Sequence, residues 1–588
     1  MARPLGCAAA ALSALACGCS DPAATAPRSC LIVTLDTTNP GALDCYGKDR
    51  GFTPNLSALA AEGVVYEEAR SVTPITLPAH TSIMTGLYPP RHTVRENGLW
   101  VVPQSADTLA ERARRAGFST SAIVAASVLA SRYALDQGFD HYESPKGRVR
   151  GPLVLDRPAA EVTDAAIAWL AARDRTRPFF LWVHYFDPHF PYAPPAQFLE
   201  QAGNAYFGEV AYMDHELGRL LDHLRADGAY DDAVIAVVGD HGESLGRHGE
   251  QTHAFLCYDA TLRVPLILRH PGGARAGERS SEIVSQVDVF ATLLELMRLG
   301  PPGDVDGLNL AAGPVPEGRG VYFESYYGMI NFNWGHIAGW LDAGGKYLHS
   351  ARPEFYDVAR DPGEERNLAV ERAARLAGYR EGIRDVAARP SLALDAAPQA
   401  GDQRGMLEAL GYAGEGDPDR PLPHPLDTES EVLLVDRIDE WSAFDRAAGL
   451  ALLGQRDEAI DVLRACLTAN PTSQIILNRL GRYLSQADRP EEAVRTFEQL
   501  LGQSPILAPK NEAWIHHYVG YWYQLQGEWE TALRHYRQAL RLDPKDRRTV
   551  LDTARALERL GEVQEAQALR ATVSGREDEP GDDGKEQE

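Results

Sequence analysis

The sequence is poor in basic residues relative to acidic ones. Its 588 residues include 58 Lys and Arg against 83 Asp and Glu, which gives a formal net charge of −25 at pH 7. Nucleic-acid binding depends largely on Lys and Arg side chains that neutralise phosphates. The charge balance therefore argues against a nucleic-acid partner, and the acidic surface is expected mainly to keep the protein soluble.

Long apolar runs are also lacking. Residues 5–16 are small and apolar and follow Arg3, but they are fewer than the roughly 20 residues that a membrane-spanning helix needs. This pattern predicts an export signal over residues 1–18. Cys17 and Cys19 lie among small residues and resemble the lipidation site of bacterial lipoproteins. We expect a periplasmic or outer-membrane lipoprotein held only by its lipid anchor, with a secreted protein as the alternative.

Cysteine is scarce as well. Of the seven cysteines, the four beyond the signal are scattered without CxxC spacing: Cys30, Cys45, Cys257 and Cys466. The spacing excludes a cysteine-based metal site and assigns no disulfide. These four are expected to be buried thiols.

Three apolar runs each lead into a carboxylate. SCLIVTL is followed by Asp36, PFFLWVHYF by Asp187, and AVIAVVG by Asp240 and then His241. Ligands in open α/β sheets collect at the carboxyl ends of the strands, so these acids are candidates for one shared polar site. A bound cation would remove the repulsion between crowded carboxylates, which predicts a metal centre.

Strand-like and helix-like patterns alternate from residue 29 to about residue 370. Residues 177–187, 231–240 and 263–272 have strand patterns, and residues 209–228 have the pattern of an amphipathic helix that ends at glycine. The alternation predicts an α/β domain over residues 29–370, with parallel strands joined by crossover helices. Residues 371–428, rich in Ala, Arg, Pro and Asp, are expected to form a peripheral helix and a linker.

A different period begins beyond residue 430. Alanines at like positions are separated by 34, 39 and 34 residues: Ala459, Ala493, Ala532 and Ala566. A 34-residue period is the signature of tetratricopeptide repeats, and the step of 39 predicts an insertion near residues 508–512. We expect an all-α solenoid over residues 429–573, whose groove binds a protein or peptide, or which serves as a cap or dimerisation element. The charged residues 574–588 are expected to be disordered.

Thr76 stands just before a helix-like run, with Pro78 near the start of that run. A hydroxyl there lies near unpaired backbone amides and the positive end of the helix, which favour an oxyanion such as phosphate or sulfate. Taken alone, Thr76 is more simply explained as a helix N-cap, worth about 1 kcal/mol and without a catalytic role.

The motifs of the first domain, in their order, resemble the sulfatase family of the alkaline-phosphatase superfamily. The resemblance rests on LIVTLDTTNPGALDCYG, TPNLSALAAEGVVYEEA, TLPAHTSIMTGLYPPRH, DPHFPYAPP, VVGDHGESLG, RVPLIL, VDVFATLLEL and FYDVARDPGEERNLA. It covers residues 29–370 and implies an α/β fold in which helices sandwich a mostly parallel sheet.

The resemblance also implies a metal site. It assigns the ion to Asp36, Asp240 and His241, with Thr37 in the place of a second acid or amide and the Thr76 hydroxyl as a further ligand. Imidazole at His241 in place of an amide favours zinc or manganese over calcium. We expect one divalent metal ion rather than two.

The nucleophile motif departs from that of true sulfatases. Their Cys or Ser, any residue, Pro, any residue, Arg is TLPAH here, so Thr76 stands at the nucleophile and His80 replaces the arginine as a substrate-binding candidate. No formylglycine is expected, because it is made from Cys or Ser. Related phosphodiesterases and phosphoethanolamine transferases use a metal-bound threonine and form a phosphothreonine, which the resemblance implies for Thr76.

Three further residues are candidates for substrate handling. Asn97 resembles an amide that contacts the substrate oxyanion, although a turn would equally explain it. His189 and His253 resemble the pair that binds substrate oxygen or protonates the leaving group, a role that suits an imidazole pKa near 6.5. A second metal site would comprise Asp187, His189 and His253, but the DxxxH spacing of two-zinc relatives is lacking.

Two other histidines receive structural interpretations. His184 lies inside a strand pattern and is expected to be a hydrogen-bonded core residue, and His248 is expected to lie in a solvated loop. Together these features predict an exported metal-dependent hydrolase or transferase of phosphate or sulfate esters, with phosphate chemistry favoured. The alternatives are a true sulfatase with an unusual nucleophile, and a catalytically silent scaffold organised by the repeats.

Overall fold

The computed structural model describes residues 26–47, 50–145, 157–332, 334–396, 421–427, 432–503 and 509–573. The expected export signal and the charged residues 574–588 lie outside these ranges, as does part of the expected linker. None of the described helices combines the length and the hydrophobicity that a membrane-spanning segment requires.

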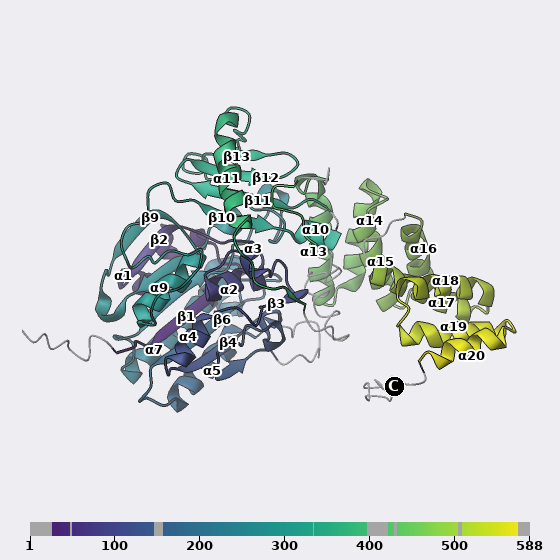
Figure 1. Ribbon diagram of the computed structural model, residues 1–588, viewed down its shortest axis with the longest axis horizontal. Helices are drawn as coiled ribbons and strands as arrows, with labels where there is room; N and C mark the ends of the chain where they lie inside the picture. Colours follow the sequence, from purple (N-terminus) through teal and green to yellow (C-terminus); the bar gives the residue numbers. More distant parts are fainter. Residues whose placement is uncertain are drawn as a thin grey trace, which may run out of the picture.

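An eight-stranded sheet forms the core of the first domain (Figure 1). Its order is β5(His141–Glu143), β4(Ser119–Val124), β6(Phe179–Tyr185), β1(Cys30–Leu35), β7(Val234–Gly239), β8(Leu266–Arg269), β2(Val64–Arg70) and β9(Glu278–Ser285). All neighbouring pairs are parallel except those of β8, which runs antiparallel to both β7 and β2. The mostly parallel α/β sheet is therefore confirmed.

Within this mostly parallel sheet, β8 departs from the expected pattern of parallel strands joined by crossover helices. Only the short helix α8(Asp259–Leu262) lies between β7 and β8 among the helices of four residues or more. A parallel partner needs a crossover long enough to return the chain across a face of the sheet, usually with a packed helix. This connection has no such helix, so β8 returns in the opposite direction.

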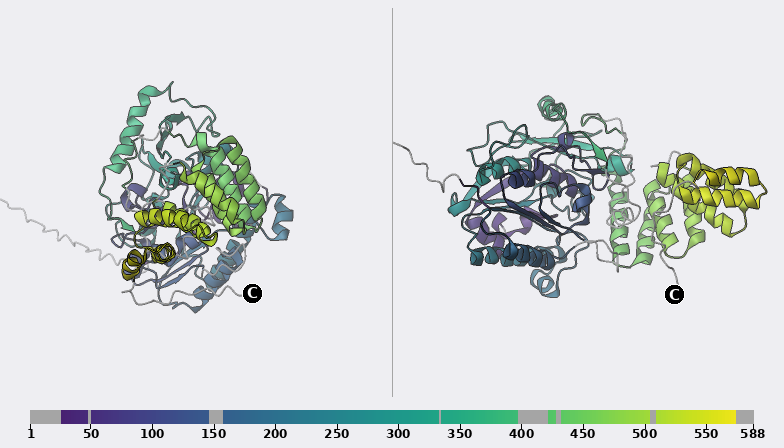
Figure 2. Two further views of the ribbon diagram at one scale, coloured as in Figure 1. Left: turned by 90° about the vertical axis from the view of Figure 1, so that its right-hand side faces the viewer. Right: turned by 60° about the horizontal axis from the view of Figure 1, so that its bottom comes forward.

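Helices cover both faces of the sheet (Figure 2, right). Helices α1(Pro54–Ala61), α5(Ala159–Ala172) and α7(Ala205–Asp227) pack together, and α2(Thr76–Thr85) packs with α9(Val287–Met297). Because both faces are covered, every residue of β1, β6 and β7 is buried. The predicted glycine-ended helix is α7, whose Gly228 has φ 75 and closes the helix in the left-handed conformation.

A smaller antiparallel sheet follows, formed by β10(Val321–Ser325), β11(Ile337–Asp342), β12(Gly345–His349) and β13(Glu354–Tyr356). Helix α11(Leu376–Ala387) packs on this sheet within the interval expected to hold a peripheral helix. Strands β3(Trp100–Val101) and β14(Asp395–Ala396) form a two-stranded sheet. The described cysteines are free thiols, two of them buried, and burial raises the pKa of Cys45 to about 11.

Paired helices form the C-terminal domain (Figure 1). They are α13(Ile438–Leu452), α14(Arg456–Ala469), α15(Gln474–Gln486), α16(Pro490–Leu501), α17(Pro509–Leu525), α18(Trp529–Leu542), α19(Arg547–Arg559) and α20(Val563–Ala571). The four periodic alanines occupy the fourth position of α14, α16, α18 and α20, and each is fully buried. The repeat period predicted from the sequence is thus confirmed, and its alanines lie where helices pack closely.

The packing of these alanines predicts that the same substitution at two positions of one helix will change the free energy of unfolding by different amounts. Ala566 and Ala568 both lie in α20, but Ala566 is 0% exposed and Ala568 is exposed. Ala566→Leu is expected to lower the free energy of unfolding of the repeats by about 1–3 kcal/mol, because the added carbons overfill the contact. Ala568→Leu should change it by less than about 0.5 kcal/mol. Urea unfolding followed by helical circular dichroism measures both, and equal effects would contradict the assigned packing.

Candidate metal and nucleophile site

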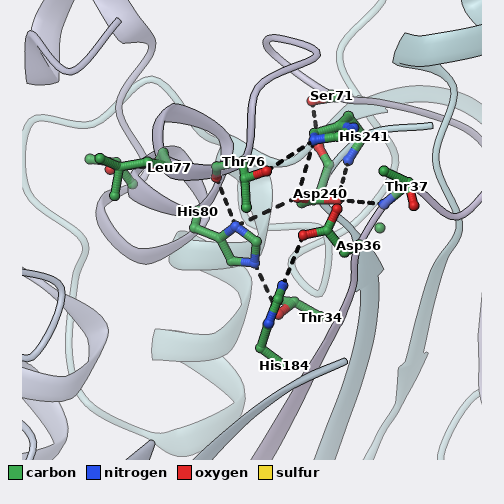
Figure 3. Close-up of polar contacts among 12 residues, drawn as sticks. Thr34, Asp36, Thr37, Ser71, Thr76, Leu77, His80, His184, Asp240 and His241 are labelled. Carbon is green, nitrogen blue, oxygen red and sulfur yellow. Dashed lines mark hydrogen bonds and ion pairs between the residues drawn. The ribbon is translucent and has the colours of Figure 1, made fainter. Parts of the chain in front are cut away.

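Two predicted acids and the predicted imidazole meet where β1 and β7 end (Figure 3). Asp36 follows β1, and Asp240 and His241 follow its neighbour β7. One ligand atom from each of the three lies within 4.8 Å of the others, and all three side chains are fully buried. Adjacent parallel strands therefore deliver these groups to one point, as their placement after apolar runs predicts.

The two buried carboxylates, Asp36 and Asp240, favour a bound cation. Burial raises the pKa of Asp36, and the nearby Glu243 raises it further. Burial also raises the pKa of Asp240, and the charge of Asp36 adds to the effect. Two crowded carboxylates in a low-dielectric site are costly unless a positive charge offsets them.

Individual atoms of the group also fit a metal ion. Asp36 Oδ1 and Asp240 Oδ2 are buried and have no hydrogen-bond partner among the described residues. His241 Nδ1 donates to the carbonyl of Gly242 at 3.1 Å, so in the neutral ring the lone pair is on Nε2. Burial lowers the pKa of His241, which keeps the imidazole neutral and able to ligate. The residues present therefore fit a divalent metal.

Surrounding groups hold the two carboxylates in place. The amide of Ala125 donates to His184 Nδ1 at 3.3 Å, so His184 Nε2 carries the proton and donates to Asp36 Oδ2 at 3.2 Å. His184 is thus a hydrogen-bonded core residue, as expected, and it also orients a ligand. The backbone amide of His241 donates to Asp240 Oδ1 at 2.6 Å, and Ser71 Oγ donates to the Asp240 carbonyl at 2.6 Å.

Thr37 contributes its backbone rather than its side chain. Its amide donates to Asp240 Oδ1 at 3.2 Å, whereas its hydroxyl donates to the carbonyl of Pro188 at 2.8 Å. Its φ of 46 lies in the left-handed region, which is unfavourable for a β-branched residue. The structure therefore turns the Thr37 hydroxyl toward Pro188, away from the role of metal ligand assigned to it from the sequence.

Thr76 lies beside this group at the start of α2. Its Oγ1 is 3.3 Å from His241 Nε2 (Figure 3). Helix α2 begins at Thr76 itself, and Ile75 stands at the N-cap position. The Thr76 side chain therefore faces the metal group and does not act as the helix cap.

Asn97 caps α2 instead. Its Oδ1 accepts a hydrogen bond from the amide of Leu77 at 2.8 Å. Its Nδ2 is buried without a hydrogen-bond partner among the described residues. Buried amide donors are normally paired, so an unpaired one at a helix N-terminus beside Thr76 suits an acceptor oxygen of a ligand.

His80 uses both ring nitrogens within the protein. Its Nδ1 donates to the carbonyl of Thr76 at 2.8 Å, and Trp182 Nε1 donates to Thr34 Oγ1 at 2.9 Å. Thr34 then donates its hydroxyl proton to His80 Nε2, at 3.0 Å. Burial lowers the pKa of His80, so the ring is neutral where true sulfatases carry an arginine charge.

His189 and His253 lie next to the metal group. The His253 ring centroid is 4.4 Å from that of His241 and 5.0 Å from that of His189. His253 Nδ1 is 3.3 Å from Glu243 Oε1, and His189 Nδ1 donates to the carbonyl of Phe190 at 2.6 Å. Burial lowers the pKa of His253 to about 3, below the ordinary imidazole value near 6.5.

The candidate Asp187, and His248, which was expected in a solvated loop, make other contacts. Asp187 Oδ1 accepts from the amide of Ala159 at 3.0 Å, at the first turn of α5, and burial raises its pKa to about 7. Among the described residues no metal-ligating group of three combines Asp187 with His189 and His253. His248 is half-buried and stacks on Tyr258 with centroids 3.7 Å apart, which corrects the expectation of a solvated loop.

Glu243 is the main site residue that sequence reasoning missed. It is fully buried, its Oε1 lies against His253, and burial raises its pKa. Gln286 was also missed, although its Nε2 donates to the carbonyls of Gly239 and Asp240. The available signal for Glu243 was its place two residues after His241 in VVGDHGES.

Comparison with known proteins finds matches to family models in both domains. Residues 28–299 match the family model described as Sulfatase, and residues 246–377 match one described as N-sulphoglucosamine sulphohydrolase, C-terminal. Residues 472–545 and 524–580 match two tetratricopeptide repeat models.

Individual relatives and solved structures match about half to three fifths of the chain. An arylsulfatase of Clostridium perfringens is 22% identical over 434 residues, which cover 58% of this chain and 89% of the relative. Human N-acetylgalactosamine-6-sulfatase is 27% identical over 345 residues, covering 48% and 65% respectively. The structure of a phosphonate monoester hydrolase of Agrobacterium radiobacter superposes with a TM-score of 0.53 and 23% identity over 61% of this chain and 95% of that chain, which shows a shared fold.

Proposed function

The chain carries a sulfatase-family hydrolase domain of the alkaline-phosphatase superfamily followed by tetratricopeptide repeats, and on that premise we propose that it cleaves phosphate esters with Thr76 as the nucleophile. One observation carries the proposal: Thr76 Oγ1 lies 3.3 Å from His241 Nε2, beside two buried carboxylates that need a cation. Threonine is not converted to formylglycine, so its own hydroxyl oxygen is the available nucleophile.

Asp36, Asp240 and His241 would hold one divalent metal. When bound, the metal lowers the pKa of a neighbouring hydroxyl and offsets negative charge on the transferred group. The mixed oxygen and imidazole donor set favours zinc or manganese over calcium. His184 orients Asp36 through the hydrogen bond described above, which keeps the Asp36 Oδ1 atom directed into the site.

In the proposed reaction, the Thr76 hydroxyl releases its proton to solvent and Oγ1 attacks phosphorus. A Thr76 Oγ1–P bond forms while the bond from phosphorus to the ester oxygen breaks. The Asn97 Nδ2 donor would contact a non-bridging oxygen. The leaving alcohol takes a proton through His253 or His189, and water or a second alcohol then releases the group from Thr76.

The protonation state of His253 is expected to change during this reaction. His253 is neutral in the substrate-free protein because it is buried. An anionic ester placed beside the ring raises the imidazole pKa, because opposite charge favours the protonated form. Glu243 lies against Nδ1, so it fixes the ring orientation for proton delivery from the opposite side. His80, whose nitrogens are both engaged, would position the Thr76 backbone rather than contact substrate.

Substitutions of Asn97 test its proposed contact with substrate separately from its capping of α2. Asn97→Asp keeps an acceptor for the Leu77 amide but removes the Nδ2 donor and adds a negative charge. We expect kcat to fall by about 100-fold to 1000-fold, as for loss of an oxyanion donor. Unfolding stability is measured separately and should also fall, because a carboxylate in this fully buried position is costly. Asn97→Ala should lose the cap as well, at about 1 kcal/mol. Full activity in Asn97→Asp would remove this residue from substrate binding.

Hydrolysis of sulfate esters is the second candidate. The names of the arylsulfatase and N-acetylgalactosamine-6-sulfatase relatives favour it. Aryl sulfate, phosphate monoester, phosphodiester and phosphonate substrates, each assayed with zinc, manganese and calcium, separate the two. We expect a phosphoryl ester to be turned over fastest, with zinc or manganese. Faster sulfate turnover would favour the sulfatase, and no turnover of any ester would favour a silent scaffold.

A further inference from the structure

Helix α13, the first helix of the repeats, lies against the catalytic domain beside α10(Tyr327–Phe332) (Figure 1). It contacts the segment that carries His253 at several points. Thr252 Oγ1 donates to Asp445 Oδ2 at 3.0 Å, and Ser442 Oγ donates to the carbonyl of Gly249 at 2.8 Å. The ring of Trp441 stacks on that of Phe255, with centroids 5.1 Å apart.

The same helix contacts the segment that carries His189. A Cβ atom added to Gly449 would lie 2.1 Å from Cε1 of Phe190, so the Phe190 ring packs directly on the helix backbone at this glycine. Phe190 follows His189, and its carbonyl accepts the His189 Nδ1 hydrogen bond. A side chain at position 449 would therefore displace the residue that orients His189.

Helix α13 thus touches the neighbours of both histidines, whose rings lie 5.0 Å apart beside His241. We propose that α13 is a positioning element of the catalytic centre, with Asp445 holding the His253 segment and Gly449 admitting Phe190 beside His189. This inference rests on the proposed function, because it concerns the two imidazoles that would protonate the leaving alcohol. In this proposal the repeats contribute to the geometry of the catalytic centre and are not a separate domain joined only by a linker.

Helix α13 is itself fixed within the repeats. Asn470 Nδ2 donates to Glu440 Oε1 at 2.6 Å, and Ser473 Oγ donates to the other oxygen of Glu440. The guanidinium of Arg479, on α15, lies 4.1 Å from the ring centroid of Phe444. Direct contacts therefore join the second repeat to α13, and α13 to the two histidine segments.

The test compares variants of the full chain on two faces of α13. Asp445→Ala removes the acceptor for Thr252, Asp445→Asn retains one, and Gly449→Ala places a methyl group against Phe190. Arg446→Ala, on the exposed face of the same helix, is the matched control. Alanine is a better helix former than glycine, so Gly449→Ala preserves α13 itself.

The kinetic readout uses phenyl phosphate and 4-nitrophenyl phosphate, with metal content measured in parallel. We expect Asp445→Ala and Gly449→Ala to lower kcat for the phenyl ester by up to about 100-fold, as for small misplacements of catalytic groups. The 4-nitrophenyl ester should lose less, because its good leaving group needs little protonation. Asp445→Asn should recover most activity. Equal losses on both esters, or no loss, would overturn the proposal.

A second readout separates this inference from the proposed function. If the unmodified protein shows no Thr76-dependent turnover of either ester, the proposed function fails. Hydrogen exchange then decides the positioning claim by itself. Exchange should accelerate over residues 249–256 in Asp445→Ala and over residues 187–192 in Gly449→Ala, and in neither segment for Arg446→Ala. Unchanged exchange in both segments would overturn the claim.

Discussion

Thr76→Val is expected to lower kcat by at least about 10⁴-fold, the scale seen when a nucleophile is removed. Valine has nearly the shape of threonine but no hydroxyl, so the buried position at the start of α2 remains filled. Asp36, Asp240 and His241 are untouched, and the metal content of the purified protein should stay the same. Steady-state kinetics and elemental analysis on the same sample measure both quantities.

Two further observations complete this test. Thr76→Ser retains a hydroxyl and should retain measurable turnover, so the pair separates loss of the oxygen from a change of packing. Rapid quenching of the unmodified enzyme with a phosphate ester should leave a phosphoryl group on the peptide that contains Thr76. Retention of full activity in Thr76→Val would exclude Thr76 from the chemistry and leave only the fold assignment.

Asp240→Asn is expected to remove most of the bound metal and to lower activity about as severely as Thr76→Val. The amide still offers an oxygen to the backbone amides of Thr37 and His241, so the local backbone has reason to persist. Its nitrogen cannot ligate a cation at the place of Oδ2, which is the atom without a hydrogen-bond partner among the described residues. Elemental analysis after dialysis measures the loss.

The same substitution should affect stability in the opposite sense. Asp36 and Asp240 repel one another in the buried site, which raises the pKa of Asp240. Without metal, Asp240→Asn is therefore expected to be at least as stable as the unmodified protein, by up to about 2 kcal/mol, as when a buried uncompensated charge is removed. Urea unfolding with a chelator present measures this. A marked loss of stability would contradict the repulsion assigned to the pair.

Asp288→Asn is the matched control, because Asp288 is also a fully buried carboxylate but is paired with an arginine. Both its oxygens accept from the guanidinium of Arg319, at 2.6 and 2.7 Å. Breaking a buried ion pair of this kind is expected to cost about 3–5 kcal/mol while the metal is retained. Asp240→Asn should thus lose metal without losing stability, whereas Asp288→Asn should lose stability without losing metal.

The sequence predicts those parts of the site that depend on position along a strand. Asp36 and Asp240 were found because apolar runs place them at the carboxyl ends of strands, and β1 and β7 prove to be neighbours. The repeats were found because Ala493 and Ala532 occupy the same helical position. Burial of a strand on both faces requires a continuous apolar run, and close helix contact requires a small residue at a regular spacing, so both are visible in the sequence.

Features that depend on side-chain direction were not predictable in this way. The Thr37 hydroxyl turns to Pro188, and Asp187 turns to the first turn of α5 although it follows a strand. The role of Glu243 depends on how a loop returns His253 to its side chain, at a separation of ten residues. The contact of α13 with the His253 segment joins residues 193 positions apart, which no local pattern records.

The proposed catalytic centre requires one cation among Asp36, Asp240 and His241, beside the Thr76 oxygen. Anomalous X-ray diffraction from crystals of the metal-loaded protein, at the absorption edge of the bound metal, tests it most directly. We predict a single strong peak within coordinating distance of Asp36 Oδ1, Asp240 Oδ2 and His241 Nε2, with Thr76 Oγ1 adjacent. A peak elsewhere, or no peak in a protein that turns over phosphate esters, would contradict it.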